Sequence, residues 1–515
     1  MQLGDILELT TARVPDRTAV IAGSETITYR ELLGRCHRLS AALSKVARPG
    51  DRVALLGENV PEVVEAYYGV PSAGMTLTFL NYRLASMELA WILNNCGATV
   101  LIAEAHLLEP LRPVLDGTSI ATVAVVGGPE VTAGTRWHEV SYADFVSAAS
   151  PHPAHHRGTD REIAWLLYTS GTTGFPKGAM LSHRNLVMST LNASIECSVR
   201  EDDRALMSMP LCHISSHMLF AYHLRGATVV LQRRYQAEEW MELVDTHGIT
   251  TTALAPTLAI DLLNHPDIDA HRLDSFRRVV AGAGAMPVTM LRRLIDRFGP
   301  VICSAYGSTE LAGSATQHPA DAYQRAIGGE EQLLAACGKA MCLLEIKVVD
   351  EQFDRCPPGT VGEIVARGDQ VTVGYWNDEE ATKESFTGDW FHTGDLGMED
   401  EEGFFYVIDR LKDMIKSGGE NVYSREVEEA LRHHPGVLDV AVIGLPDDRW
   451  GERVVAVVVP RDGAPLDTDS VLQEMRARLA SFKLPKQFFL TNDLPRNVSG
   501  KVLKRELRST YMDAR

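Results

Sequence analysis

The apolar positions in the first two thirds of the chain follow two alternating patterns. Segments with helical spacing, such as residues 60–73 and 85–96, predict helices. Short continuous apolar runs predict buried strands, and they occur at residues 53–57, 100–103, 122–126 and 227–231. Strands that alternate with helices form mainly parallel sheets covered by helices on both faces, so an α/β fold is expected.

The pattern changes from about residue 337 onward. Strands predicted at 344–349 and 362–368 lie among dense turn residues and indicate a β-rich subdomain at about 337–410. After the charged segment 409–413, we expect a new set of elements, with helices at 424–433 and 468–482 and strands at 438–443, 453–459 and 487–490. The prediction is a large N-terminal domain, residues 1–410, of parallel-rich sheets flanked by helices plus the β-rich subdomain, followed by a small α+β domain, residues 411–515.

Composition and charge narrow the class of protein. The 515 residues carry a formal net charge of −18, which argues against nucleic-acid binding because that function uses a basic face. The N-terminal stretch does not resemble a signal peptide, and no apolar run reaches about 18 residues, so we expect a cytoplasmic protein without an integral membrane segment. Eight cysteines without a CxxC pair are typical of free thiols in a reducing compartment. His152, His155 and His156 lie in the stretch PHPAHHRGTD, which contains two prolines and favours a solvated loop over a metal site.

One stretch carries a clear chemical signal. Residues 168–178 read YTSGTTGFPKG, a loop rich in glycine and hydroxyl groups that ends at Lys177 and follows an apolar run. Backbone N–H groups in such a loop can converge on an anion, and the lysine adds a positive charge, so phosphate is the natural ligand. The stretch does not match the nucleotide-binding pattern GxxxxGK[ST], because Pro176 precedes the lysine and Gly178 follows it. A Gly-rich surface turn remains the alternative from this stretch alone.

The stretch resembles the phosphate-loop signature of the adenylate-forming superfamily, which includes acyl- and aryl-CoA synthetases. Further motifs that resemble this family follow in order along nearly the whole chain, at residues 210–214, 281–287, 306–310, 390–395, 409–413, 416–421 and 495–501. Two positions depart from the family pattern: Asp409 stands where glycine is usual, and Trp390 lies one place early.

The resemblance implies ATP-dependent activation of a carboxylic acid as an acyl-adenylate, followed by transfer of the acyl group to CoA. It implies that Lys501 bridges the carboxylate and the α-phosphate, that His213 gates the acyl site, and that Glu310 binds Mg²⁺. Tyr306 would stack on adenine, Val407 would line the adenine slot, and Asp395 would bind the ribose hydroxyls. The residues expected to bind ATP or AMP are Thr169, Ser170, Gly171, Thr172, Thr173, Gly174, Lys177, Gly282, Ala283, Gly284, Tyr306, Gly307, Ser308, Thr309, Asp395, Val407 and Arg410. Any one of these taken alone could be structural; it is the ordered set that supports the interpretation.

The same resemblance implies a mobile C-terminal domain. Lys412 occupies the hinge position, and rotation there would move Lys501 away from the acyl group. The same rotation would bring the residues of the CoA pantetheine route to the acyl group, namely Ser417, Gly418 and Gly419. A carrier-protein phosphopantetheine in place of CoA is the alternative acceptor, and a homodimer is left open. Nothing favours an oxygenase that acts on the adenylate, and the intact Lys177, Glu310, Asp395 and Lys501 argue against a non-catalytic binding protein.

The expected acyl pocket indicates an uncharged substrate tail. It would be lined by His213, Ser215, Ser216, His217, Ala281, Ala312 and Gly313. Amino-acid-activating members of the family usually carry a carboxylate between the positions of Leu211 and Gly226, and its absence here counts against an amino-acid substrate. Ser215 and Ser216 stand where many aryl-CoA ligases carry a bulkier residue, which suggests room. A medium-chain or ring-bearing acid is therefore preferred, and a role in fatty acid metabolism is expected. His217 could bind a polar tail or face away from the pocket.

Overall fold

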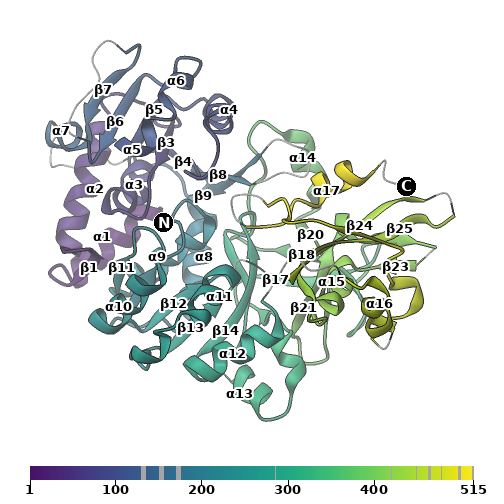
Figure 1. Cartoon of the computed structure of the whole chain (residues 1–515). Coiled ribbons are helices and arrows are strands. Elements are labelled where there is room, and N and C mark those ends of the chain that lie inside the picture. Colours follow the sequence, from purple (N-terminus) through teal and green to yellow (C-terminus); the bar gives the residue numbers. More distant parts are fainter. Residues whose placement is uncertain are drawn as a thin grey trace. The chain divides into compact units, whose positions relative to one another are not determined.

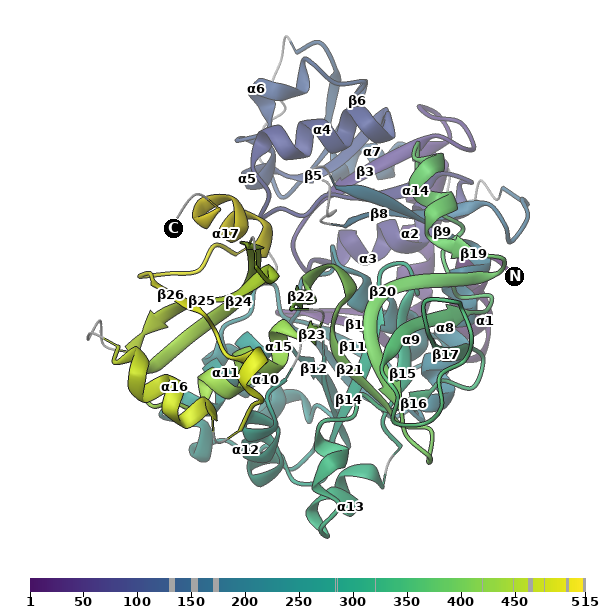
Figure 2. The same cartoon turned by 90° about the vertical axis from the view of Figure 1, so that its right-hand side faces the viewer.

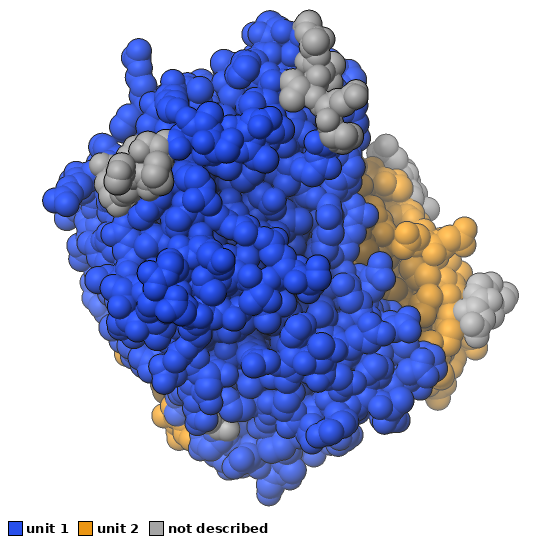
Figure 3. Space-filling model, turned by 90° about the vertical axis from the view of Figure 1, so that its left-hand side faces the viewer, with its two compact units in different colours: residues 1–346, 366–391 blue, residues 347–365, 392–515 orange. Residues whose placement is uncertain are grey.

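The structure is a computed structural model that describes residues 1–512 except 129–134, 150–155, 170–175, 283, 285, 320, 419, 448, 462–465, 477 and 497–499. The chain forms two compact units (Figure 3). Unit 1 comprises residues 1–346 and 366–391, and unit 2 comprises residues 347–365 and 392–515. The boundary expected at residue 410 between the N-terminal and C-terminal domains lies inside unit 2. That boundary refers to the point about which the C-terminal domain would move, so it stays a prediction.

The first sheet of unit 1 has seven strands in the order β7-β6-β5-β3-β4-β8-β9 (Figure 1). Its pairings are parallel except between β8 and β9, which are antiparallel. The strands are β3 (Arg52–Leu56), β4 (Thr76–Phe79), β5 (Val100–Glu104), β6 (Thr122–Val126), β7 (His138–Ser141), β8 (Ile163–Thr169) and β9 (Lys177–Ser182).

The second sheet of unit 1 has nine strands in the order β16-β15-β14-β13-β12-β10-β11-β1-β2. The run from β14 to β1 is parallel, and antiparallel strands complete both edges. The strands are β1 (Thr18–Ala22), β2 (Glu25–Thr28), β10 (Arg204–Met207), β11 (Thr228–Leu231), β12 (Thr251–Leu254), β13 (Arg278–Ala281), β14 (Ile302–Ser308), β15 (Gly313–Gln317) and β16 (Lys339–Ala340). The expected α/β class with parallel-rich sheets is confirmed.

Helices cover both faces of the seven-stranded sheet because its strands are apolar on both sides. In β3, Val53 and Leu55 belong to one buried core, and Ala54 and Leu56 belong to another. The first core includes side chains of α1 (Leu3–Arg13), α2 (Tyr29–Leu43), α3 (Pro61–Ser72), α8 (His183–Glu196) and α9 (Met218–Arg225), and the second includes those of α4 (Ser86–Cys96). Helix ends follow local chemistry: Thr28 and Glu31 form a capping box before α2, and Gly97 ends α4 in the left-handed region.

The β-rich subdomain contains the sheet β17-β18-β20-β19, and β21 pairs with β20. Its strands are β17 (Glu345–Val349), β18 (Gly362–Arg367), β19 (Phe386–Thr387), β20 (Trp390–Glu399) and β21 (Phe405–Arg410). The two strands predicted at 344–349 and 362–368 are therefore present.

The C-terminal part of unit 2 is a sheet with helices on both faces (Figure 2). The strand order is β23-β22-β25-β24 with β26 on β25, and the strands are β22 (Ile415–Ser417), β23 (Glu420–Val422), β24 (Val437–Asp447), β25 (Gly451–Pro460) and β26 (Gln487–Leu490). Alternate residues of β25 face two cores. Helices α15 (Ser424–Arg432) and α16 (Thr468–Arg476) pack in one core, and α17 (Lys504–Tyr511) packs in the other.

One predicted helix is too long. The segment 468–482 forms α16 only as far as Arg476, and Ala480 takes an extended conformation before a short 3₁₀ turn at Ser481–Lys483. Leu479 and Phe482 still pack against the core that contains α16. Their spacing is therefore compatible with a continued helix, which is why the predicted helix was too long. No described helix combines the length and the apolar character needed to cross a bilayer, and all eight cysteines are free thiols.

Candidate active site

The two strands around the predicted phosphate loop hold its ends side by side. Strands β8 and β9 pair so that Thr169 lies opposite Lys177, and the Thr169 hydroxyl donates to the Lys177 carbonyl at 3.4 Å. The intervening residues Ser170, Gly171, Thr172, Thr173 and Gly174 lie outside the described residues. The described geometry therefore places Lys177 at the base of a hairpin, next to the loop expected to bind phosphate.

Lys177 and Glu310 are linked through Tyr375, which sequence reasoning did not single out. The Lys177 Nζ lies 5.3 Å from the centroid of the Tyr375 ring, and the Tyr375 hydroxyl donates to Glu310 Oε1 at 3.1 Å. Tyr375 is held beside β9 by a bridge to Ala179. Burial and the Glu310 charge raise the pKa of Tyr375, so the hydroxyl remains a neutral donor.

The hairpin of β14 and β15 carries the next motif. Tyr306 donates its backbone N–H to the Thr316 hydroxyl at 3.2 Å. A Cβ on Gly307 would lie 1.9 Å from the Gly313 carbonyl oxygen, so only glycine fits there. Ser308 pairs with Gly313 across the hairpin, and the Thr309 carbonyl accepts from the Ala312 N–H at 3.0 Å, so Glu310 lies within the tight turn that joins the two strands.

The neighbouring strand β13 ends beside this hairpin. Its last residue, Ala281, pairs with Leu254 of β12 and Ser304 of β14, and the Gly282 N–H donates to the Leu254 carbonyl at 3.1 Å. Gly284 is exposed, and Ala283 lies outside the described residues. In open α/β sheets ligands bind at the carboxyl ends of the strands, which is where these residues lie.

The expected acyl-pocket residues meet at the same edge. Ser215, Ser216 and His217 form the 3₁₀ helix η1 (Ile214–His217), which His213 precedes. The His217 ring lies so close to Gly313 that a Cβ there would be 2.2 Å from the ring. Ala312 is buried with φ 50°, a value rare for alanine. Burial, with the charge of Arg83, lowers the pKa of His213 to about 4, so this histidine is neutral near pH 7.

The residues predicted in unit 2 also converge. Asp395 of β20 lies opposite Arg410 of β21, and Arg410 Nε lies 2.6 Å from Asp395 Oδ1. Lys501 is exposed as a residue, yet desolvation and the charges of Arg410 and Lys412 lower the pKa of its ammonium to about 8. Asp395 and Asp413 partly oppose this shift, because their negative charges favour the protonated ammonium.

The predicted hinge segment is charged but not simply solvated. Lys412 lies in a 3₁₀ turn, Leu411–Asp413, and desolvation lowers its pKa. Asp409, which replaces the family's usual glycine, is buried and accepts a hydrogen bond from the Ser424 hydroxyl at 2.8 Å. Asp413 is also buried and pairs with Arg508 at 3.0 Å. Half-buried Val407 precedes this segment and accepts from Arg425 through its carbonyl at 3.2 Å.

The predicted pantetheine route includes one position that requires glycine. Ser417 is buried at the end of β22. Gly418 has φ 65°, donates its N–H to the Trp450 carbonyl at 2.8 Å, and lies so near the Trp450 ring that a Cβ would be 2.9 Å from it. Gly419 lies outside the described residues. Trp450 was not predicted, because no local pattern marks it.

Comparison with known proteins agrees with this geometry. Residues 7–376 match the AMP-binding enzyme family, and residues 426–501 match the AMP-binding enzyme C-terminal domain. The chain belongs to the AMP-binding enzyme family. It is 37% identical over 500 residues to a feruloyl-CoA synthase of Amycolatopsis, covering 96% of each chain, and 33% identical over 514 residues to an indoleacetate–CoA ligase of Aromatoleum aromaticum, covering 99% of this chain and 98% of the relative. The solved o-succinylbenzoate CoA synthetase of Bacillus subtilis, in complex with its acyl-adenylate intermediate, is similar with a TM-score of 0.85 at 29% identity, covering 99% of this chain and 98% of that one.

The chain is thus an AMP-forming acid–CoA ligase.

Two other clusters of ionisable side chains do not belong to the candidate active site of the ligase. Glu58, Glu104 and His106 lie close enough to hold a metal ion, but Arg233 pairs with both carboxylates and Arg234 pairs with Glu58. The cluster is therefore already neutralised. Of the predicted histidine stretch, His152 and His155 lie outside the described residues, and His156 pairs with Glu162 at 3.0 Å.

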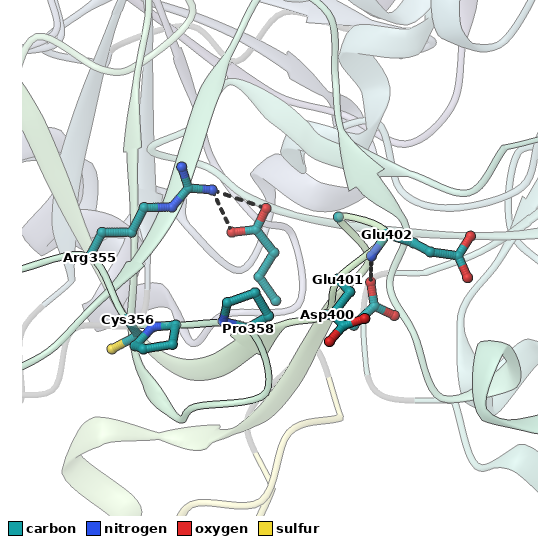
Figure 4. Close-up of a pocket in the computed structure, with 9 residues that line it drawn as sticks. Arg355, Cys356, Pro358, Asp400, Glu401 and Glu402 are labelled. Atoms are coloured by element: carbon teal, nitrogen blue, oxygen red, sulfur yellow. Dashed lines mark hydrogen bonds and ion pairs between the residues drawn. The ribbon is translucent and has the colours of Figure 1, made fainter.

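A surface groove in unit 2 contains none of the predicted site residues (Figure 4). It lies between a segment that includes Arg355 and Cys356 and the acidic turn at residues 399–403. Arg355 Nη2 binds both carboxylate oxygens of Glu399, at 3.0 and 3.3 Å. Because none of the residues predicted to bind substrate lines this groove, we assign it no role in the ligase reaction.

Proposed function

We propose that this ligase activates an acid with an uncharged, medium-length or ring-bearing tail. A carboxylate oxygen attacks the α-phosphorus of ATP, the bond to pyrophosphate breaks, and an acyl-adenylate forms. The thiol of CoA then attacks the acyl carbon, AMP leaves, and the thiol proton is released. The feruloyl and indoleacetate relatives are named for ring-bearing acids, which supports the ring-bearing choice.

The observation that carries this proposal is the meeting of Asp395, Arg410 and Lys501 from three separate motifs. Attack of one anion on another needs positive charge at the reacting centre. The Arg410 guanidinium and the Lys501 ammonium supply two cations near one carboxylate. We infer that Lys501 contacts both the substrate carboxylate and the α-phosphate, while Asp395 accepts hydrogen bonds from the ribose hydroxyls.

The site residues of unit 1 suit the pyrophosphate end of ATP and a divalent cation. Lys177 is a mobile positive charge, and the Tyr375 hydroxyl orients the Glu310 carboxylate through one oxygen, which leaves the other available. One carboxylate together with nucleotide phosphates is a donor set that suits Mg²⁺, so Glu310 would hold that ion. When bound, Mg²⁺ neutralises charge on the phosphate oxygens.

The second half-reaction requires that Lys501 leave the acyl carbon accessible to a thiol. We propose that rotation at Lys412 does this, since a domain can turn through changes at very few residues. Gly418 would then admit the narrow pantetheine arm, with Ser417 and Gly419 beside it. His213, the residue proposed to gate the acyl pocket, is half-buried, and its lowered pKa keeps it neutral near pH 7. It therefore adds no positive charge to the pocket.

Pyrophosphate release tests the proposal directly. The purified enzyme is given ATP and Mg²⁺ with a panel of fatty, arylpropenoic and arylacetic acids, each with and without CoA. We expect acid-dependent pyrophosphate, with AMP and acyl-CoA appearing when CoA is present. Release that needs an acid but leaves CoA unconsumed would favour a carrier-protein acceptor, and no release with any acid would overturn the proposal.

A further inference from the structure

His217 is a buried histidine with one ring nitrogen left unbound. Only 2% of the residue is exposed. Its Nδ1 lies 2.8 Å from the Ile214 carbonyl oxygen, whereas its Nε2 has no hydrogen-bond partner within the described part of the chain. Buried polar atoms are nearly always paired, so this nitrogen requires an explanation.

The partner of Nδ1 decides what Nε2 can do. A carbonyl oxygen only accepts, so Nδ1 must carry the hydrogen of the ring. Burial lowers the pKa of His217 to about 4, so the ring is neutral near pH 7 and has only that one N–H. Nε2 therefore presents a lone pair, and its partner must be a hydrogen-bond donor.

A second buried histidine, His223, has hydrogen-bond partners at both ring nitrogens and serves as the structural comparison. His223, in α9, is fully buried, and its pKa is likewise lowered to about 4 by burial. Both of its nitrogens have partners, since Nδ1 lies 3.0 Å from the Tyr68 hydroxyl and Nε2 lies 3.2 Å from the Ala19 carbonyl. His217 differs from His223 in having one nitrogen unsatisfied, although both are equally removed from water.

The surroundings of His217 connect it to the candidate active site. A Cβ at Gly313 would lie 2.2 Å from the His217 Cε1 and 2.5 Å from its Nε2, so the ring edge that carries this nitrogen packs against the start of β15. Gly313 pairs with Ser308 of β14, two residues after Tyr306 in the hairpin that ends at the carboxyl edge of the sheet. His217 therefore lies next to the hairpin at the carboxyl edge of the sheet, where ligands bind in open α/β folds.

We propose that His217 Nε2 accepts a hydrogen bond from the tail of the acid. The preferred substrates then carry a donor, a phenolic hydroxyl or a ring N–H, at the end remote from the carboxylate. This inference rests on the proposed function, because it names the class of acid that the same site activates. His217 acts here in selecting the substrate and takes no part in the chemical steps.

Paired acids that differ only in the donor test the inference. The pairs are 4-hydroxycinnamic against 4-methoxycinnamic acid, and indole-3-acetic against 1-methylindole-3-acetic acid. We measure kcat/KM for pyrophosphate release and take the ratio within each pair. For the wild-type enzyme we expect the donor-bearing member of at least one pair to be favoured by about tenfold or more, since a site that binds a polar hydrogen discriminates against the analogue that lacks it.

The variants separate selection from structure. His217→Leu and His217→Phe remove the acceptor, and we expect either to bring the ratio close to one. His223→Leu removes an equally buried imidazole and should lower the thermal unfolding midpoint while leaving the ratio unchanged. A wild-type ratio near one in both pairs, or a folded His217 variant that keeps the wild-type ratio, would overturn the inference while leaving the ligase intact. Absence of pyrophosphate release with every acid would instead overturn the proposed function.

Discussion

Asp395 and Arg410 are cross-strand neighbours whose side chains form an ion pair, with Arg410 Nε 2.6 Å from Asp395 Oδ1. The carboxylate is almost fully buried, with 5% of the side chain exposed, while the arginine keeps 39% exposed. A buried carboxylate is stable only when it is paired and hydrogen-bonded. We propose that Asp395 accepts hydrogen bonds from the ribose and that the exposed part of Arg410 contacts a phosphate.

Asp395→Asn should weaken ATP binding. The amide provides one acceptor oxygen where the carboxylate provides two, and it leaves Arg410 without its charge partner. We expect the KM for ATP to rise about tenfold or more, measured from initial rates of pyrophosphate release. Asp369→Asn is the control, because Asp369 pairs with Arg184 at 2.7 Å on an exposed surface, where such pairs contribute little. An unchanged KM for Asp395→Asn would remove Asp395 from the nucleotide site.

Lys501→Ala should separate the two half-reactions. Loss of the ammonium should slow adenylate formation by roughly 100-fold or more, because a preorganised charge at the reacting centre is lost. Conversion of a supplied acyl-adenylate and CoA into acyl-CoA should continue at close to the normal rate. Lys383→Ala, at an exposed position, should affect neither step. Equal losses in both half-reactions for Lys501→Ala would show that its assigned role is wrong.

The rate of adenylation should depend on pH through Lys501. Desolvation and the cations of Arg410 and Lys412 lower the pKa of Lys501 to about 8, and the bridging role requires the protonated form. Because the proton is lost as pH rises, kcat/KM for the acid should fall above about pH 8, by about tenfold per unit. Lys501→Arg should lower the maximum but abolish this decline, since arginine stays protonated. The same decline in the arginine variant would assign it to another group.

Glu310→Gln should raise the Mg²⁺ requirement. The amide keeps the size of the side chain and an oxygen that can accept from Tyr375, but it removes the charge that attracts the ion. We expect the Mg²⁺ concentration for half-maximal rate to increase about tenfold, with activity partly recovered at high Mg²⁺. Glu380→Gln, at an exposed position, serves as the control. A normal Mg²⁺ titration for Glu310→Gln would exclude Glu310 as the metal ligand.

Lys412→Pro should impair the thioester step selectively. Proline fixes φ near −65° and restricts the residue before it, so rotation at this position becomes difficult. We expect adenylate formation within about threefold of the wild-type rate and thioester formation reduced at least about tenfold. Lys412→Ala, which keeps backbone freedom, should retain both steps. Normal overall turnover in the proline variant would rule out rotation at Lys412.

The fold was accessible from sequence because its strands are continuous apolar runs. The strands predicted at 100–103 and 122–126 correspond to β5 and β6, and both are buried throughout. The predicted helix at 468–482 was too long, because apolar residues beyond Arg476 pack against the same core from a non-helical segment. Periodicity records which side chains are buried, and it does not by itself record where helical hydrogen bonding stops.

A candidate site could be proposed from sequence only where its residues lie in ordered motifs. Tyr375 contacts Lys177 and Glu310 from a segment distant in sequence, and no local pattern marks it. Likewise, the unsatisfied Nε2 of His217 and the packing of this ring against Gly313 are tertiary features that the sequence does not encode locally. Side-chain partners across the fold depend on tertiary packing, which spacing along the chain does not reveal.

The central claim is that the enzyme forms an acyl-adenylate, and transfer of a labelled carboxylate oxygen to AMP tests it most directly. The wild-type enzyme is given ATP, CoA and an active acid labelled with ¹⁸O in both carboxylate oxygens, and the mass of the product AMP is measured. If an acyl-adenylate forms, one carboxylate oxygen bonds to the α-phosphorus and remains there when the thiol breaks the acyl C–O bond. We predict one ¹⁸O atom in AMP for each acyl-CoA formed. Unlabelled AMP, or ADP together with labelled inorganic phosphate, would contradict adenylate formation by this ligase.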